Sequence, residues 1–315
     1  MQRLILDWSL VAALCTMLAW GMNFAFVKYV LDHLGVGAFM FLRFSVLPLL
    51  GLALLVAVFR HRIAHTWPRR ADLPRFVACA LVGHVLHISA VMYGMNLSTA
   101  FSSSLVLTCQ PLFTLAILAW LGAERLRRQQ IAGTLVAFAG IALFLADKFA
   151  AGFARAGLGD LTLLVAGASF SAYTVMSRPL ADRYGPLIVL SYTLLFSMPV
   201  MLAFTYPYFG EWELRTHGPA VWAAIFWALV VCSFFGWLTW TWVNSKRGVA
   251  RSAPFMYLMP PVAGVMAWLT LGETFTWLKI LGAAITMAGV AWAQFSSAPG
   301  SAEKAPPRSV PPVSP

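Results

Sequence analysis

Long apolar segments separated by short polar connections occupy most of the chain. Ten of them approach the roughly 20 residues that an α-helix needs to cross the hydrocarbon core of a bilayer. Their approximate bounds are 8–28, 36–59, 76–95, 98–121, 130–147, 158–178, 186–206, 219–243, 252–271 and 277–295. Most of the connections are too short to hold a separate soluble domain. The pattern predicts an all-α integral membrane protein with ten transmembrane helices.

The composition excludes a soluble protein, and the two ends of the chain each need a separate interpretation. Of the 315 residues, 60% are hydrophobic and 10% are charged, and the mean hydropathy is +0.78, whereas soluble domains carry about 25% charged residues. The first apolar segment continues well beyond the roughly 7–15 residues of a signal-peptide core, so we expect it to remain as the first helix. Residues 296–315 contain six prolines and no apolar periodicity, which predicts a disordered tail.

The net charge of +11 is distributed as membrane topology requires. If the N-terminus is cytoplasmic, sixteen of the 22 Lys and Arg residues fall in cytoplasmic segments. Five lie on the other side and one, Arg43, lies within a span. This excess of basic residues on one side is the positive-inside bias. It predicts that both termini are cytoplasmic, and it gives no reason to expect a nucleic-acid partner.

The two halves of the chain repeat each other. At an offset of 149 residues Pro111 aligns with Pro260 and Glu124 with Glu273, and further matches are Gly133 with Gly282, Ala139-Gly140 with Ala288-Gly289 and, at an offset of 150, Lys28 with Arg178, Asp32 with Asp182 and Gly35 with Gly185. We therefore predict five-helix repeats over 1–150 and 151–295, followed by the tail at 296–315. Because five is odd, the second repeat must enter the membrane from the opposite side. Inverted repeats of this kind are typical of secondary transporters, whose substrate site lies near mid-membrane between the halves.

Several stretches, taken in order, resemble the drug/metabolite transporter superfamily of the EamA type. They are "AWGMNFAFVKYVL", "FLRF", "GAERLRRQQIAG" and "LGETFTWLKILGAAITMAGV", and the resemblance covers roughly residues 8–295. It implies a ten-helix exporter of amino acids or related metabolites in a bacterial inner membrane. It also implies that four helices of each half surround a central cavity while the fifth and tenth pack outside, where small residues permit close approach.

Polar residues within the apolar spans are the candidates for a substrate site. The resemblance places Asn23 at the cavity wall, although an interhelical hydrogen bond is an equally physical role for an amide in a membrane. Arg43 lies seven residues into the second span, where a charge is a functional candidate by default; the alternative is a structural partner such as Asp32 or helix carbonyls. Lys28 lies near a helix end, and we expect its side chain to extend to the interface as an anchor.

The third and fourth spans add histidines and an amide. His84 and His87 share a helix face and could contact substrate or relay a proton, but two histidines without a third ligand do not make a metal site. Gln110 precedes Pro111, which breaks backbone hydrogen bonding. Tyr257 precedes the equivalent Pro260, and Tyr173 aligns with Asn23 at an offset of 150. These residues complete the polar candidates for the substrate site.

Aromatic and acidic residues have less specific roles. Trp20, Phe24, Phe170, Trp237 and Trp240 could line an apolar site or serve as packing and belt residues. Glu124 and Glu273 are each expected to begin a helix, where a carboxylate is favoured by the helix dipole. The cysteines, which are Cys15, Cys79, Cys109 and Cys232, all fall within spans and have no C-x-x-C neighbour, so we expect small apolar fillers rather than a zinc or disulfide framework.

The sequence contains weaker indications of other functions. "GLGD" at 157–160 and "GASF" at 167–170 have the form of intramembrane protease motifs, but the second aspartate or later histidine that each protease needs is absent from the spans. A channel or receptor remains an alternative, although no ring of charge or filter loop is visible. No nucleotide-binding G-x-x-x-x-G-K-[ST] motif occurs, and we expect no cofactor.

We therefore predict alternating access around a central cavity, with a small-molecule substrate in a lipid bilayer. Because no carboxylate lies near the middle of a span, proton coupling, if present, would use His84 or His87; the alternative is a facilitator driven by the substrate gradient. We expect a monomer or a homodimer. The sequence does not name the substrate.

Overall fold

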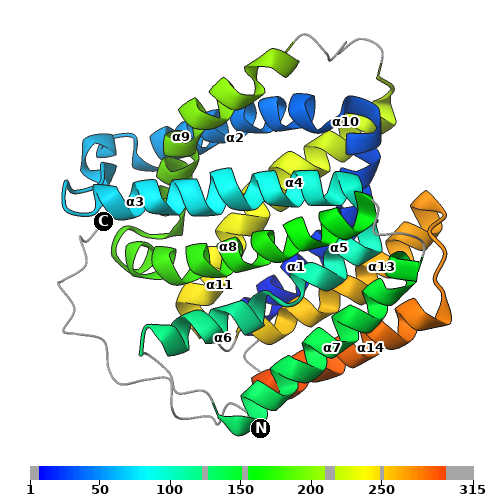
Figure 1. Ribbon diagram of the computed structural model, residues 1–315. Helices are drawn as coiled ribbons and strands as arrows, with labels where there is room; N and C mark the ends of the chain where they lie inside the picture. Colours follow the sequence, from blue (N-terminus) through cyan, green and yellow to red (C-terminus); the bar gives the residue numbers. More distant parts are fainter. Residues whose placement is uncertain (1–6, 123–126, 151–154, 210–216, 249–251, 296–315) are drawn as a thin grey trace, which may run out of the picture.

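The computed structural model describes residues 7–122, 127–150, 155–209, 217–248 and 252–295, and none of these lies in a β-strand. The first half contains α1 (Trp8–Leu34), α2 (Val36–Phe59), η1 (Ile63–Thr66), α3 (Leu73–Cys79), η2 (Ala80–Leu86), α4 (His87–Leu97), α5 (Ala100–Leu107), α6 (Gln110–Trp120) and α7 (Arg128–Ala150). The second half contains α8 (Arg155–Tyr184), α9 (Pro186–Thr205), η3 (Tyr206–Tyr208), α10 (Pro219–Phe226), η4 (Trp227–Gly236), α11 (Trp237–Arg247), η5 (Ala253–Leu258), α13 (Met259–Leu271) and α14 (Trp277–Phe295). Figure 1 shows them as a single helical bundle.

The helices follow the ten predicted spans closely. Within the described part of the chain, seven helical segments are long and apolar enough to cross a membrane. The other three predicted spans correspond to shorter apolar helices, Arg128–Phe144, Phe255–Leu271 and Trp277–Ala293. The all-α membrane fold is therefore confirmed. Glu124 and the tail at 296–315, for which the sequence predicted a helix start and disorder, lie outside the described residues.

The sequence predicted one continuous α-helix for the third span and one for the eighth, but both are interrupted. Each contains a π-helical stretch, η2 in the first half and η4 in the second. The two stretches overlap at an offset of 149 residues, so the departure from α geometry is itself part of the repeat. Such stretches occur frequently at functional sites. The fourth span is also divided, because α5 ends at Leu107 and α6 restarts at Gln110, next to Pro111.

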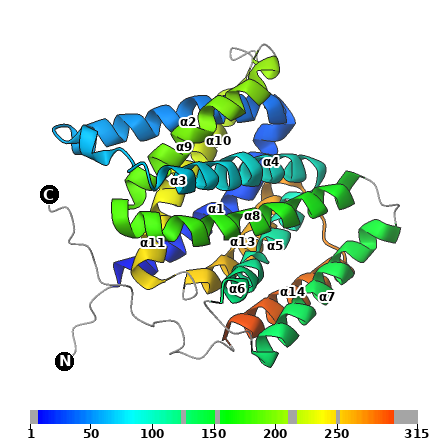
Figure 2. The same cartoon turned by 60° about the vertical axis from the view of Figure 1, so that its left-hand side comes forward.

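Helix packing is symmetric under exchange of the two halves. Helix α2 packs on its counterpart α9, and α7 packs on α14 (Figures 1 and 2). Helix α4 packs on α8, and the exchanged pair, α1 with η4 and α11, is also in contact. The same holds for α6 with α8 and α13 with α1. An inverted repeat produces this pattern, since each contact between halves must have a partner.

The α7–α14 pair stands at one side of the bundle in both views and depends on small residues (Figures 1 and 2). A Cβ atom added at Gly133 would lie 2.5 Å from the backbone nitrogen of Ala293. A Cβ atom added at Gly282 would lie 2.6 Å from the backbone nitrogen of Phe144. Because apolar burial gives no net attraction between helices in lipid, close packing of this kind must hold the pair together. The close approach expected from the Ala-Gly spacing is confirmed.

Glu273 caps a helix of the other half rather than its own. Its Oε1 accepts a hydrogen bond from the Ala100 nitrogen at 2.7 Å, and its Oε2 accepts one from the Phe101 nitrogen at 3.4 Å. These are free N–H groups at the first turn of α5, where a carboxylate also meets the positive end of the helix dipole. The prediction of a capping role at the start of 277–295 was therefore wrong in its target.

We expect Glu273→Ala to lower the stability of the folded protein by about 1 kcal/mol, the usual cost of losing a helix cap. Glu273→Gln keeps an oxygen acceptor and should lose less. Thermal unfolding of the two purified variants in detergent measures the difference. Equal melting temperatures for Glu273→Ala and the unchanged protein would contradict the capping role.

The ends of the bundle differ in how they are held. At one end, which we call the Asp7 end, Arg247 Nη1 lies 2.6 Å from Asp7 Oδ2 and Arg183 Nη1 lies 2.8 Å from Asp72 Oδ2. The first pair joins α1 to the end of α11, and the second joins the start of α3 to the end of α8. The Tyr184 hydroxyl also donates to Asp72, and this bond, together with Arg183, lowers the pKa of the Asp72 carboxyl.

At the opposite end, the Lys28 end, Lys28 is a helix-to-helix contact and not the predicted interfacial anchor. Its Nζ lies 3.3 Å from the Met95 carbonyl oxygen and 3.2 Å from that of Asn96, both in the last turn of α4. It also lies 3.6 Å from Asp32 on its own helix. A cation is favoured at a helix C-terminus, and the side chain therefore turns toward α4.

Candidate substrate cavity

A cavity of about 100 Å³ lies where the two halves meet. The first half contributes side chains from α1, α2, α4, α5 and α6, and the second half contributes side chains from α8, η4, α11, η5 and α13. Eight of the candidate residues line it, namely Trp20, Asn23, Phe24, Arg43, His87, Gln110, Phe170 and Trp237. The structure therefore brings together residues that are up to about two hundred positions apart in the chain.

Arg43 is the charged residue of this cavity. Arg43 is 4% exposed, and it makes no hydrogen bond or ion pair with any described residue. The predicted alternative, a pair with Asp32, is wrong, because Asp32 lies beside Lys28. Arginine stays protonated in proteins, and an unpaired buried charge is strongly unfavourable. The guanidinium therefore has its N–H donors available for an anionic group in the cavity.

Two amides supply unpaired acceptors to the same space. The Oδ1 atom of Asn23 and the Oε1 atom of Gln110 are both buried without a hydrogen-bond partner. The backbone carbonyl of Gln110 is used differently, since it accepts from the Ser171 hydroxyl at 2.7 Å and ties α6 to α8. Leaving a buried polar atom unpaired costs about 1–3 kcal/mol. Such atoms beside a cavity are therefore suited to hydrogen bonds with what enters it.

The histidines divide between the cavity and the packing behind it. His87 lines the cavity, and its Nδ1 lies 2.8 Å from the Ala166 carbonyl oxygen, so Nδ1–H must be the donor. His84 does not line the cavity. Its Nε2 lies 3.0 Å from Thr193 Oγ1, within hydrogen-bond distance. The Ala166 carbonyl therefore fixes the tautomer of His87, and Thr193 fixes the position of the His84 ring.

Aromatic rings form one wall. Trp237 packs edge-on to Phe170 at 5.4 Å between ring centroids and lies tilted over His84 at 4.8 Å. Trp20 donates its indole N–H to the Cys232 carbonyl at 2.9 Å, inside the π-helical stretch η4. This bond joins α1 to the π-helical stretch of the other half. The aromatic wall is therefore tied to the irregular segment.

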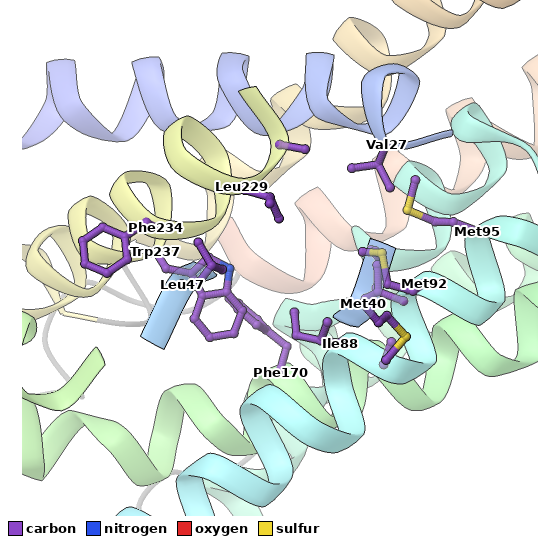
Figure 3. Close-up of a cluster of buried hydrophobic side chains, with 14 of the residues drawn as sticks. Val27, Met40, Leu47, Ile88, Met92, Met95, Phe170, Leu229, Phe234 and Trp237 are labelled. Carbon is purple, nitrogen blue, oxygen red and sulfur yellow. The ribbon is translucent and has the colours of Figure 1, made fainter. Parts of the chain in front are cut away.

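Apolar and thioether side chains form the opposite wall, which sequence reasoning missed. Figure 3 shows Met92 and Met95 of α4 gathered with Val27 of α1, while Phe170 and Trp237 lie on the other side of the cluster. Met256 and Met259 from the second half also line the cavity. These residues carry no sequence signal, because a methionine within an apolar span looks the same whether it faces lipid or a cavity.

Besides His84, two predicted residues lie away from the main cavity. Tyr257 donates its hydroxyl to the Val290 carbonyl at 3.1 Å and packs with the core around α7 and α14, so it supports the outer pair. Tyr173 lines a second cavity of about 20 Å³, between α8 and α11. Neither residue lines the main cavity. Trp240, an alternative aromatic candidate, lies with Tyr173.

The small cavity is the counterpart of part of the large one. Tyr173, Ser177 and Thr241 line it, and at offsets of 150, 150 and 149 they correspond to Asn23, Val27 and Met92, which line the large cavity. Arg178, the counterpart of Lys28, also lines it. The same surface of each repeat thus opens a wider space in the first half and a narrower one in the second.

Asp160, from the protease-like "GLGD", is a buried carboxylate that the sequence did not single out as structural. It accepts hydrogen bonds from Ser98 Oγ at 2.5 Å and Ser102 Oγ at 2.8 Å, and it joins α8 to α5 and the end of α4. A carboxylate in the membrane requires such donors. Its burial therefore serves helix packing.

Comparison with known proteins gives a consistent result. Residues 7–146 and 157–294 each match the EamA-like transporter family. The chain is 29% identical over 287 residues to the "Probable terminal-alkyne amino-acid exporter" of Streptantibioticus cattleyicolor, covering 90% of this chain and 91% of that protein. It is 27% identical to the "Probable amino-acid metabolite efflux pump" of Salmonella typhimurium, over 88% of this chain and 92% of that protein. A solved crystal structure shares the fold, with a TM-score of 0.64, 18% identity and coverage of 92% of this chain and 96% of that one.

Proposed function

Because this chain belongs to the EamA-like transporter family of the drug/metabolite transporter superfamily, we propose that it exports amino acids or related small metabolites by alternating access. As a family member it is a transporter and not an enzyme, so the intramembrane hydrolase alternative is removed. It is a multi-pass membrane protein, and we place it in a bacterial inner membrane with both termini in the cytoplasm. The names of its relatives support an amino-acid or metabolite substrate.

The observation that carries the proposal is the cavity between the halves. It contains an unpaired guanidinium and two unpaired amide oxygens in an otherwise apolar lining. A ligand site combines such an apolar lining with a few placed polar groups. Its position between inverted repeats is also that of the substrate site in secondary transporters.

The unequal cavities beside two equivalent surfaces support alternating access. The α1–α4 surface borders a space of about 100 Å³, whereas the equivalent α8–α11 surface borders about 20 Å³. Exchanging the conformations of the halves would widen the second and narrow the first. The interhelical ion pairs of Asp7 and Asp72 are consistent with a state held closed at the Asp7 end. In the opposite state these pairs would part.

The titratable groups of the cavity favour a facilitator over a proton-coupled exporter. His87 donates its Nδ1 proton to the Ala166 carbonyl oxygen, and His84 Nε2 is hydrogen-bonded to Thr193 Oγ1. The described residues that line the cavity include no Asp or Glu to pass a proton on. We therefore infer that the substrate gradient, and not a proton gradient, drives transport.

Counterflow in proteoliposomes tests the function. Vesicles loaded with unlabelled apolar amino acid should take up the labelled compound transiently, with saturation and with faster entry than into empty vesicles. An imposed pH gradient should leave the final distribution unchanged, because no proton is coupled.

Linear uptake without saturation and without acceleration by internal substrate would indicate a channel. Absence of uptake for every amino acid and metabolite tried would refute the proposal. A pH-driven accumulation that disappears in the double variant His84→Gln, His87→Gln would assign coupling to the histidines.

A further inference from the structure

We propose that the cavity selects zwitterions. Arg43 binds the carboxylate of the substrate, and Asn23 and Gln110 bind its ammonium group. The four methionines that line the cavity, which we call the methionine wall, hold its apolar side chain; they are Met92, Met95, Met256 and Met259. The substrate class is therefore free α-amino acids with small aliphatic or thioether side chains. Amines without a carboxylate and permanently cationic drugs are excluded. This inference rests on the proposed function and specifies its selectivity.

Charge decides the first part of the selectivity. Arg43 is a buried, permanently charged group without a protein partner, and the described lining residues contain no carboxylate that could neutralise it or attract a cation. In a low-dielectric site the guanidinium attracts an anion and repels a cation strongly. A carboxylate can also accept two parallel N–H bonds from one guanidinium. A substrate without a carboxylate would leave the charge unpaired.

The amide oxygens decide the second part. An ammonium group has three N–H donors and no acceptor, so it requires acceptors in the cavity. Asn23 Oδ1 and Gln110 Oε1 are buried, unpaired acceptors that lie on α1 and α6. A simple carboxylic acid would leave both atoms unpaired, whereas an α-amino acid presents an ammonium beside its carboxylate. The combination of one cation and two acceptors thus matches a zwitterion.

The remaining lining decides the side chain. The apolar lining of the cavity includes Met92, Met95, Met256, Met259, Val27 and Val91. Figure 3 shows Met92, Met95 and Val27 close together. Unbranched thioethers adapt to different ligand shapes, so we expect tolerance among leucine, methionine and norleucine. The volume of about 100 Å³ is below the roughly 300–1,000 Å³ of pockets for drug-sized ligands. Large ligands should therefore bind poorly.

A binding experiment with matched analogues tests the proposal on the whole protein in detergent. We would measure competition by leucine, leucinamide, N-acetyl-leucine, isoamylamine and tetraphenylphosphonium against labelled leucine. Leucinamide and N-acetyl-leucine should each bind about tenfold or more weakly than leucine, as expected when a charged group loses its hydrogen bonds. Isoamylamine and tetraphenylphosphonium should not compete.

Variants then assign the carboxylate to one residue. Arg43→Gln should bring the affinity ratio between leucine and leucinamide close to unity, and Arg43→Lys should keep part of it. Arg60→Gln, at the exposed end of the same helix, is the matched control and should keep the full ratio. A purely structural role for Arg43 would lower binding of both ligands without changing their ratio.

Equal binding of leucine and leucinamide by the unchanged protein would overturn the proposal, as would an unchanged ratio in a folded Arg43→Gln variant. The comparison within the unchanged protein keeps the test decisive if that variant does not fold. Counterflow separates the two proposals. Transport without discrimination refutes the zwitterion site alone, whereas discrimination without transport refutes the proposed function.

Discussion

Replacing Ser233 by phenylalanine is expected to abolish transport while the protein still inserts and folds. Ser233 lines the cavity from the π-helical stretch η4, and its hydroxyl is already used, because it donates to the Ala228 carbonyl at 2.6 Å. A benzyl group at this position would occupy much of a space of only about 100 Å³. Overpacking of this kind costs about 1–3 kcal/mol, which a folded membrane protein can tolerate.

Counterflow and size-exclusion chromatography together measure this effect. Ser233→Ala is the matched control. It removes the intrahelical hydrogen bond, worth about 1 kcal/mol, but leaves the cavity open, so its transport should remain near that of the unchanged protein. Full transport by monodisperse Ser233→Phe would show that substrate does not pass through this cavity.

Gly133→Leu is expected to prevent α7 from docking on α14 and to eliminate most of the folded protein. The new Cβ would lie 2.5 Å from the Ala293 nitrogen and 2.8 Å from the Gly289 carbonyl oxygen. Both are helix backbone atoms, which cannot move aside as a flexible side chain can. The helices would have to separate, and the packing that holds them in lipid would be lost. We expect a cost of about 3 kcal/mol, the upper part of the overpacking range.

The yield of monodisperse protein and its melting temperature in detergent measure this loss. Gly218→Leu provides the control, because Gly218 precedes α10 with φ −69° and a Cβ atom there meets nothing within 4 Å. Equal yield and equal melting temperature for the two variants would show that the close approach of α7 and α14 does not limit stability.

The membrane spans could be predicted from the sequence because each one is determined by local physics. In lipid each backbone polar group must be paired within its segment, so an apolar stretch of the required length has little choice except a helix. The second span illustrates this, since the predicted 36–59 is α2 (Val36–Phe59) in the structure. Gly35 and Gly185, matched by the repeat, likewise adopt the same left-handed φ, 76° and 84°, at equivalent turns.

The sequence also identified most polar groups of the cavity. Arg43, Asn23 and Gln110 are conspicuous because a polar group in an apolar span is unfavourable unless it is paired or faces a cavity. Their gathering around one cavity required the fold, since α1, α2 and α6 could have turned these side chains toward different neighbours. The repeat boundaries at 150 and 151 stay a prediction.

Only the tertiary structure decided which group each polar side chain contacts. Lys28 contacts the end of α4, Glu273 caps a helix in the other half, and Tyr257 reaches a carbonyl of α14. The methionine wall likewise exists only because α4 and η5 face the same space. Sequence by itself determined where the chain must be helical and where polarity is out of place, because those are properties of a segment in its solvent. Which group each side chain meets depends on the packing of segments far apart in the chain, and only the assembled bundle decides that.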